Sequence, residues 1–410
     1  MTDIPISSNR HAPSPPVPSR GLAALLYLFD PMALRCQVYG AFLRDMGFEV
    51  SISKLYHPAL RFSPRHLADS LVRTLKEGLR LVRCRPILLI VTNSDIVTIF
   101  LAGTVKLLSG AKVVYDVIDL PFPFGNRPGA EKFAALVGST FLFADGLLSH
   151  GRSKIDRLRD GIRRSPGGPH DSRRVIYFPT VIPCEIKLPD RDSARRTLSL
   201  DSETVLGFCG NIFTDTRGID ISGFSSMLRA FNEVHRRRPA SKLLLCGVES
   251  DNPLLCQLIS RFVEADHQAG IVALGKFRFG DSTHLSFLAA VDILILPGDS
   301  NPRINFVDRM KTAEYLLAGK PIIAWETDEV SRVFENEVDA LILPMDQELR
   351  MSDLVERLVM DRDLEARLSA GALRKLIKER IPEVYRVPFR DLVVAVLSRK
   401  TQERSTDLRV

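Results

Sequence analysis

A lysine and a glutamate stand three residues apart in a stretch bounded by two apolar runs. They are Lys311 and Glu314, within residues 299–325, DSNPRINFVDRMKTAEYLLAGKPIIAW. The pattern predicts a short helix over 308–318, ended by Gly319, with a strand on either side. Near the helix start, Lys311 would favour a phosphate, and Glu314, on the same face, could accept hydrogen bonds from a ribose diol. The alternative is an exposed Lys–Glu pair, which stabilises a helix by about a few tenths of a kcal/mol.

A second stretch with binding chemistry is CGNIFTDTRGID, residues 209–220. It follows an apolar run and leads into a predicted helix. Gly210 permits a tight turn or a close approach of the backbone to a ligand. Arg217 and Gly218 place a guanidinium beside a permissive residue at the helix start, an arrangement suited to a diphosphate. The alternative is a plain capped loop, because the stretch is neither a P-loop nor a dinucleotide fingerprint.

Strand and helix patterns alternate along the chain and restart after a polar segment at 182–202. This repetition predicts an α/β protein with two doubly wound, Rossmann-like domains and a ligand cleft between them. Both candidate stretches then lie at the carboxyl ends of strands in the second sheet, where such folds bind ligands. The expected divisions are a tail (1–20), an N-terminal domain (21–185), a linker (186–203), a C-terminal domain (204–381) and, over 382–410, a helix packing back on the N-terminal domain, then a tail.

Composition narrows the possible partners. The chain has 410 residues with 45% apolar residues and a net charge of +7, which indicates an anionic partner. No apolar run is as long as a membrane span, and the N-terminus lacks the apolar segment of a secretory signal. The six cysteines show no CxxC spacing and the histidines no ligand-like pairing, so we expect reduced cysteines and no metal. We find no nucleic-acid motif.

At this point a family resemblance becomes clear. The segments FCGNIFTDTRGID, VDILILPGDS and MKTAEYLLAGKPIIAW resemble, in order and spacing, the nucleotide-sugar-binding domain of GT-B glycosyltransferases, especially glycosyltransferase family 4 (glycosyltransferase group 1). The segments AKVVYDVIDLP and VIYFPTVIP resemble the acceptor domain of the same family. The resemblance covers about residues 22–395 and implies the GT-B fold.

The resemblance implies roles for the donor-side residues. Glu314 corresponds to the glutamate that holds the donor ribose, and Lys311 to a lysine frequent in one branch of the family. Arg217, with Gly218 behind it, corresponds to the cation that holds the donor phosphates. Gly210 corresponds to the glycine that lets the donor approach.

Two positions of the family's donor site carry other residues in this chain. Further candidate residues lie on the donor side and on the acceptor side of the expected cleft. Phe306 stands where the family motif has a glutamate, and Asn211 where a phosphate-binding arginine is expected. Arg303 or Arg309 could supply the missing positive charge. On the acceptor side, Arg35 corresponds to an arginine after the first loop. Asp116 and Asp119 resemble a loop that faces the donor, where they would orient the acceptor or take its proton; alternatively they only cap the loop.

The implied activity is transfer of a sugar from a nucleoside diphosphate sugar to a glycan or lipid-linked acceptor, without a metal or other cofactor and with retention. The resemblance implies an enzyme of surface polysaccharide or glycolipid synthesis. It also implies a cytoplasmic location, with peripheral contact to the inner face of the membrane as an option. A second hypothesis is a degenerate GT-B protein that only binds a sugar nucleotide or assists an assembly, favoured by Phe306 and Asn211. A third, a sugar-nucleotide epimerase, is disfavoured by the string MKTAEYLLAGKP.

One predicted helix bears on the membrane option. Within residues 65–85, an apolar stripe runs through Leu67, Leu71, Leu75, Leu79 and Val82, with basic residues mainly on the other faces. A basic amphipathic helix of this kind can lie on an anionic membrane surface. We expect instead that the stripe packs on the sheet and that the charges are solvated.

Overall fold

A computed structural model describes most of the chain. The described residues are 21–27, 30–54, 64–92, 96–117, 144–156, 174–183, 185–201, 204–215 and 217–398. Asp119 lies outside these residues.

The N-terminal half forms a six-stranded parallel sheet with the strand order β2-β1-β3-β4-β5-β6. Its central strands are almost wholly buried and apolar, as expected of parallel strands covered on both faces. The strands are β1 Leu22–Tyr27, β2 Glu49–Lys54, β3 Leu88–Thr92, β4 Lys112–Val117, β5 Gly146–Ser149 and β6 Val175–Tyr177. The helices between them are α1 Asp30–Asp45, α2 Pro64–Cys84 and α3 Ile96–Ser109.

The C-terminal half forms a second six-stranded parallel sheet, ordered β12-β11-β10-β7-β8-β9. The order reverses between β7 and β10, and such a switch point opens a crevice at the carboxyl ends of these two strands. The strands are β7 Val205–Cys209, β8 Lys242–Cys246, β9 Ile271–Ala273, β10 Ile293–Leu296, β11 Ile322–Trp325 and β12 Leu341–Leu343. The helices are α7 Phe224–Arg237, α8 Pro253–Phe262, α9 Ser282–Ala290, α10 Pro302–Asn305, α11 Met310–Ala318, α12 Val330–Val333, α13 Met351–Met360 and α14 Arg362–Glu379.

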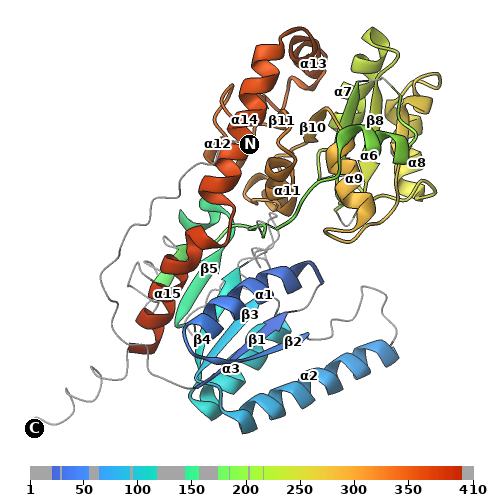
Figure 1. Cartoon of the computed structure of the whole chain (residues 1–410). Helices are drawn as coiled ribbons and strands as arrows, with labels where there is room; N and C mark the ends of the chain where they lie inside the picture. The colour runs from blue at the N-terminus through green and yellow to red at the C-terminus, as the bar shows by residue number, and fades with distance from the viewer. Residues whose placement is uncertain are drawn as a thin grey trace, which may run out of the picture.

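Two segments of the chain run between the halves (Figure 1). The predicted linker contains a short helix, α6 Arg191–Thr197, which Asp190 caps and which packs on α9. Helix α15, Glu383–Leu397, follows α14 but packs on the N-terminal sheet. There Phe389 stacks on Tyr39 with ring centroids 5.2 Å apart, and Phe178 meets Tyr39 edge-on at 4.9 Å. The chain therefore crosses between the domains twice.

The predicted packing of the α2 stripe on the sheet is wrong for Leu75 and Leu79, whose exposed fractions are 57% and 60%. Val82 does pack against the core, and the side chains of Leu67 and Leu71 lie outside the described residues. The packed face instead carries Thr74, Gly78 and Leu81. At Gly78 an added Cβ would lie 2.6 Å from Leu101 Cδ1 on α3, so the two helices meet at a residue without a side chain. Among the described residues, no helix is both long and apolar enough to span a bilayer.

Candidate functional site

The switch point of the second sheet brings together Gly210, after β7, and Lys311, on α11. Gly210 has a φ of +139°, in the region that favours glycine. A Cβ added there would lie 2.6 Å from Lys311 Nζ. Helix α11 ends, as predicted, at Gly319, which has the left-handed φ of +59°. The two stretches that the sequence indicated therefore meet at one place.

Lys311 lies in surroundings that disfavour its charge. Its Nζ sits 4.0 Å from the centroid of the Phe208 ring. Burial first, and then the neighbouring charge of Arg309, lower the pKa of Lys311 to about 7. No ion pair or hydrogen bond involves this side chain in the described part of the chain. An anion bound beside Nζ would supply the missing partner.

Arg309 is a second cation at the same helix terminus. It is the N-cap residue of α11, and no side chain caps the first turn of that helix. One guanidinium nitrogen donates to the Pro297 carbonyl at the end of β10, whereas Nη2 is buried without a partner. Burial lowers the pKa of Arg309 to about 10. The free backbone N–H groups of α11 and two under-partnered cations thus face the switch point from one side.

Glu314 lies one helical turn beyond Lys311 and is buried, with 5% of its surface exposed. Its Oε2 is 3.4 Å from Nε2 of His284, and this is its one polar side-chain contact within the described ranges. The carboxylate therefore retains acceptor capacity that the protein does not use. Arg309 and Lys311 could contact a phosphate, and the carboxylate of Glu314 one turn later could accept hydrogen bonds from the diol of an attached sugar.

His284 is the site residue that sequence reasoning missed. It lies on α9, is fully buried, and stacks on Phe277 with ring centroids 4.6 Å apart. The sequence carries no signal for its role, because 30 positions separate it from Glu314 and a lone histidine has no spacing to interpret. The contact arises from packing of α9 against α11.

Cys209, His284 and Glu314 place potential metal ligands within 4.8 Å of one another. The hydrogen bonding does not suit a metal. Nδ1 of His284 accepts a hydrogen bond of 3.2 Å from the Gly280 N–H, so the ring proton is on Nε2. A ligating histidine needs the opposite arrangement, a free Nε2 lone pair and a donating Nδ1–H. We derive no metal chemistry from this cluster.

The other donor-side candidates lie in less enclosed positions. Arg217 is exposed and pairs with Asp215, whose carboxylate accepts from Arg217 Nε at 3.1 Å and from its backbone N–H at 2.8 Å. Gly218, with a φ of +77°, continues this turn, and Asn211 is exposed. Arg303 falls on α10, but its side chain lies outside the described part of the molecule. The described contacts do not bring Arg217 to Lys311.

Arg35 and Asp116 need reassignment. Asp116 lies on β4 with no exposed surface, and Arg35 donates to both of its oxygens, at 2.7 and 2.9 Å. Tyr39 donates to Asp116 as well, and Arg35 also reaches the carbonyls of Phe178 and Pro179. A carboxylate enclosed in this way has no access to an acceptor, so the pair holds α1 to the sheet. Asp119 stays a prediction outside the described residues.

Polar contacts join the two domains next to the candidate site. Glu329, at the start of α12, accepts from the backbone N–H groups of Arg152 and Ser153 at 2.7 and 2.9 Å. Asp308, just before α11, pairs with the fully buried Arg380 and accepts from Tyr177 at 3.2 Å. The segment leading into α11 is therefore held by the N-terminal domain as well as its own.

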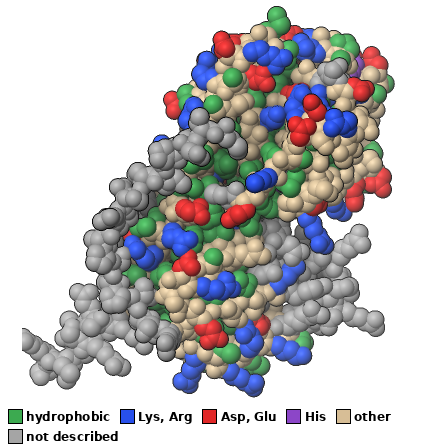
Figure 2. Space-filling view, in the orientation of Figure 1, with side chains coloured by type: hydrophobic (Ala, Val, Ile, Leu, Met, Phe, Trp, Pro, Cys, Tyr) green, Lys and Arg blue, Asp and Glu red, His purple; other side chains and the backbone are tan. Residues whose placement is uncertain are grey.

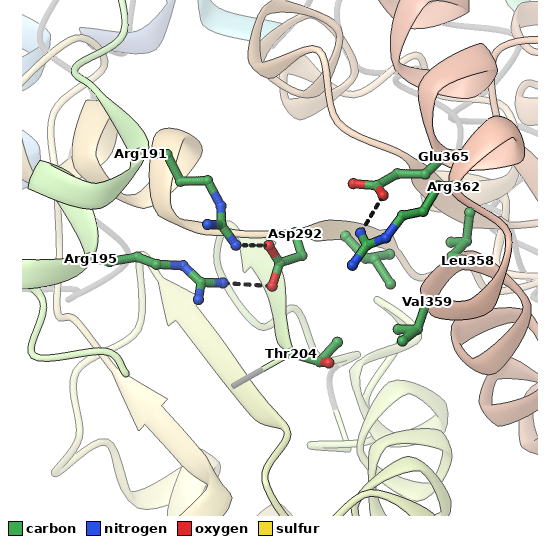
Figure 3. Close-up of a pocket in the computed structure, with 9 residues that line it drawn as sticks. Arg191, Arg195, Thr204, Asp292, Leu358, Val359, Arg362 and Glu365 are labelled. Atoms are coloured by element: carbon green, nitrogen blue, oxygen red, sulfur yellow. Dashed lines mark hydrogen bonds and ion pairs between the residues drawn. The ribbon is translucent and has the colours of Figure 1, made fainter. Parts of the chain in front are cut away.

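A separate cavity lies at the opposite edge of the second sheet (Figure 3). Thr204 and Asp292, which precede β7 and β10, line it, and its volume is about 230 Å³. Asp292 binds Arg191 and Arg195, each at 2.6 Å. Because ligands of such sheets bind at the carboxyl ends of the strands, we assign these ion pairs to the packing of α6, not to the donor site.

Comparison with known proteins finds a family model that matches part of the chain. Residues 203–361 match the family model described as glycosyl transferases group 1. A curated relative, the D-inositol 3-phosphate glycosyltransferase of Stackebrandtia nassauensis, is 27% identical over 262 residues, which are 62% of this chain and 54% of the relative. The chain thus aligns with about half the length of that relative.

Solved structures show the fold over almost the whole chain. The HepE protein of Anabaena in complex with UDP-glucose has a TM-score of 0.68 and 13% identity, covering 92% of this chain and all of that one. Sucrose-phosphate synthase of Thermosynechococcus elongatus has a TM-score of 0.70 at 13% identity and the same coverage. The predicted GT-B fold, two parallel-sheet α/β domains, is confirmed.

Proposed function

We propose that the protein is a glycosyltransferase that takes a sugar from a nucleoside diphosphate sugar. The observation that carries this proposal is the pair of under-partnered cations, Arg309 and Lys311, at the start of α11, one turn from the unused carboxylate of Glu314. The family match over 203–361 and the glycosyltransferase name of the relative support it. The fold-related HepE protein was solved with UDP-glucose.

The chemistry follows from where charge develops. The bond between the anomeric carbon and the diphosphate oxygen breaks, and the nucleoside diphosphate leaves with the electron pair. The acceptor hydroxyl forms the new glycosidic bond and loses its proton. Arg309, Lys311 and the N–H groups of α11 stabilise the growing negative charge on the diphosphate, the task a divalent ion performs elsewhere. Glu314 holds the ribose, and we propose Asp119 for the acceptor proton and transfer with retention.

For the acceptor we propose a glycan or a lipid-linked sugar at an anionic membrane surface, in surface polysaccharide or glycolipid synthesis on the cytoplasmic side. Helix α2 supports the membrane part, since Val72, Leu75 and Leu79 form an exposed apolar row. Lys76 and Arg83 on the same helix are exposed too. In Figure 1 this helix lies on the outer side of the N-terminal domain, away from the C-terminal domain, and Figure 2 shows Lys and Arg side chains along that end of the molecule.

A thermal-shift screen with UDP, GDP, ADP and their sugars tests donor binding. A ligand at a hundredfold excess over its Kd stabilises the native state by about 2.7 kcal/mol and raises the melting temperature. No shift with any nucleotide, in a well-folded sample, would contradict the proposal. A nucleotide that binds but is never transferred or hydrolysed would favour the alternative, a binding protein that has lost activity, to which Phe306 and Asn211 point.

Hydrolysis of the bound sugar nucleotide then tests Glu314. We expect Glu314→Gln, which keeps the shape but removes the charge, to lower kcat/KM about 10-fold or more, because a hydrogen bond from the ligand to a carboxylate contributes about 1.5–3 kcal/mol. Glu365→Gln is the matched control, since that carboxylate lines the cavity at the opposite edge of the sheet. Equal rates in Glu314→Gln and wild type would refute the assigned role.

A further inference from the structure

We propose that His284 is a positioning residue for ligand binding: it donates Nε2–H to one oxygen of Glu314 and leaves the other oxygen for the hydroxyls of a ribose. The inference rests on the proposed function and adds to it the part of the protein that orients the carboxylate. The observation behind it is the 3.4 Å contact between Nε2 of His284 and Oε2 of Glu314 in a buried setting.

The imidazole ring is held on several sides. Phe277 stacks on it almost in parallel, at an interplanar angle of 7°, and Phe279 packs at 5.5 Å between centroids. The Gly280 N–H donates to Nδ1. Asp281 caps α9 and accepts from the backbone N–H of His284 at 2.8 Å. The ring cannot turn over without losing its backbone hydrogen bond, so the direction of its Nε2–H is fixed.

The proton on Nε2 has a carboxylate oxygen near it. Because Nδ1 accepts from Gly280, the neutral ring carries its proton on Nε2. This nitrogen is buried and has no hydrogen bond within the limits of good geometry. A buried N–H without a partner is unfavourable, so it attracts Oε2 of Glu314, which is 3.4 Å away. The contact thereby selects one rotamer of the glutamate.

Orientation of Glu314 matters because a vicinal diol is recognised by geometry. With Oε2 directed to His284, Oε1 is left for the hydroxyls of a ligand. Without His284 the carboxylate can rotate and either oxygen can face the ligand, so the hydrogen bonds to a diol lose their preorganisation. The loss should fall on the discrimination between ribose and deoxyribose, and not on phosphate binding, which Lys311 and Arg309 provide.

The test is calorimetric titration of the full chain with UDP, GDP and ADP, each compared with its 2′,3′-dideoxy counterpart. For the nucleotide that binds, we expect the wild type to prefer the ribose form about 10-fold or more. His284→Phe keeps the aromatic stacking and removes the N–H, and should reduce this preference to about twofold or less. His284→Gln carries an amide N–H at the position of Nε2 and should recover part of the preference.

A double variant separates positioning from general damage. If His284 acts through Glu314, adding His284→Phe to Glu314→Gln changes the ribose preference no further. An unchanged preference in His284→Phe would overturn the inference. If His284→Phe does not fold, His284→Gln is compared with His284→Leu. Equal ribose preferences in these two variants would overturn the inference. A wild type that binds nucleotides without ribose preference would refute the role of Glu314 and the inference together, whereas no nucleotide binding at all would refute the proposed function itself.

Discussion

The lowered pKa of Lys311 makes a quantitative prediction about ligand binding. In the free protein, burial and then the Arg309 charge disfavour the ammonium form and lower the pKa of this lysine to about 7. The groups that act on its charge are Arg309, Cys209 and Glu314. Burial raises the pKa of Cys209 well above its ordinary value, so that thiol stays neutral near pH 7. A bound diphosphate stabilises the ammonium form, and binding is therefore coupled to proton uptake.

The size of the effect follows from the two protonation states. About nine tenths of the free protein carries a charged Lys311 at pH 6, but about 3% does at pH 8.5. If the bound phosphate restores the ordinary lysine pKa of about 10.4, the Kd rises about 30-fold across this range, or about 2 kcal/mol. Affinity is thus highest at low pH and falls as the pH rises above 7.

Calorimetric titration with a nucleotide sugar measures this dependence. A nucleotide sugar is preferable to a free diphosphate, whose terminal phosphate itself titrates at a pKa of about 6. Lys311→Met should bind weakly at every pH, and Lys311→Arg should keep a charge and lose the pH dependence. A wild-type slope equal to that of Lys311→Met would refute the assignment of Lys311 to the phosphate.

The same pKa predicts the stability of the free protein. Between pH 7 and about 10.4 the unfolded chain holds a proton on Lys311 that the folded protein lacks, so this group makes stability rise with pH. Below pH 7 both states are charged and the full cost of the buried ammonium remains. Lys311→Met should therefore melt at a higher temperature than the wild type at pH 6, while it loses ligand affinity. A lower melting temperature at that pH would contradict the argument.

Two further predictions concern the domain contact and helix α2. Arg380→Met should destabilise the protein by about 3–5 kcal/mol in urea unfolding, because it leaves the buried Asp308 carboxylate without its cation. The control, Arg386→Met, breaks an exposed ion pair and should destabilise the protein by less than about 1 kcal/mol. Joint replacement of Leu75 and Leu79 by Ser should weaken sedimentation with anionic vesicles without loss of stability, whereas Ile377→Ser, at an equally exposed site, should not.

The fold was predictable because its signals are local. Continuous apolar runs mark strands buried on both faces, and the apolar run before Gly210 is the strand β7. Gly319 ends α11 through a left-handed backbone conformation that the sequence pattern already indicated. The short helix α6 was missed, since its polar sequence, RDSARRT, lacks an apolar periodicity.

The candidate site was only partly predictable, because its contacts join distant segments. Gly210 and Lys311 could be brought together by the rule that ligands bind at carboxyl ends of strands. The contacts of Glu314 with His284 and of Asp308 with Arg380 depend on helix packing, for which no single sequence offers a signal. The turn at Arg217 did have a sequence signal. An aspartate two residues earlier, Asp215, often accepts a hydrogen bond from the backbone of such a turn.

The replacement of an expected glutamate by Phe306 bears on whether donor binding survives. The Phe306 carbonyl would lie 2.9 Å from a Cβ at Gly151, so this segment touches the N-terminal domain through its backbone. The neighbouring Asn305 carbonyl accepts from the N–H of Glu329, and Asp308 pairs with Arg380. These backbone and ion-pair contacts hold the segment that leads into α11. The missing glutamate removes one hydrogen-bonding group that the family resemblance implies for the sugar. Arg309 and Lys311 at the start of α11 and Glu314 one turn later remain, and they are the groups on which the proposed binding of a nucleoside diphosphate rests.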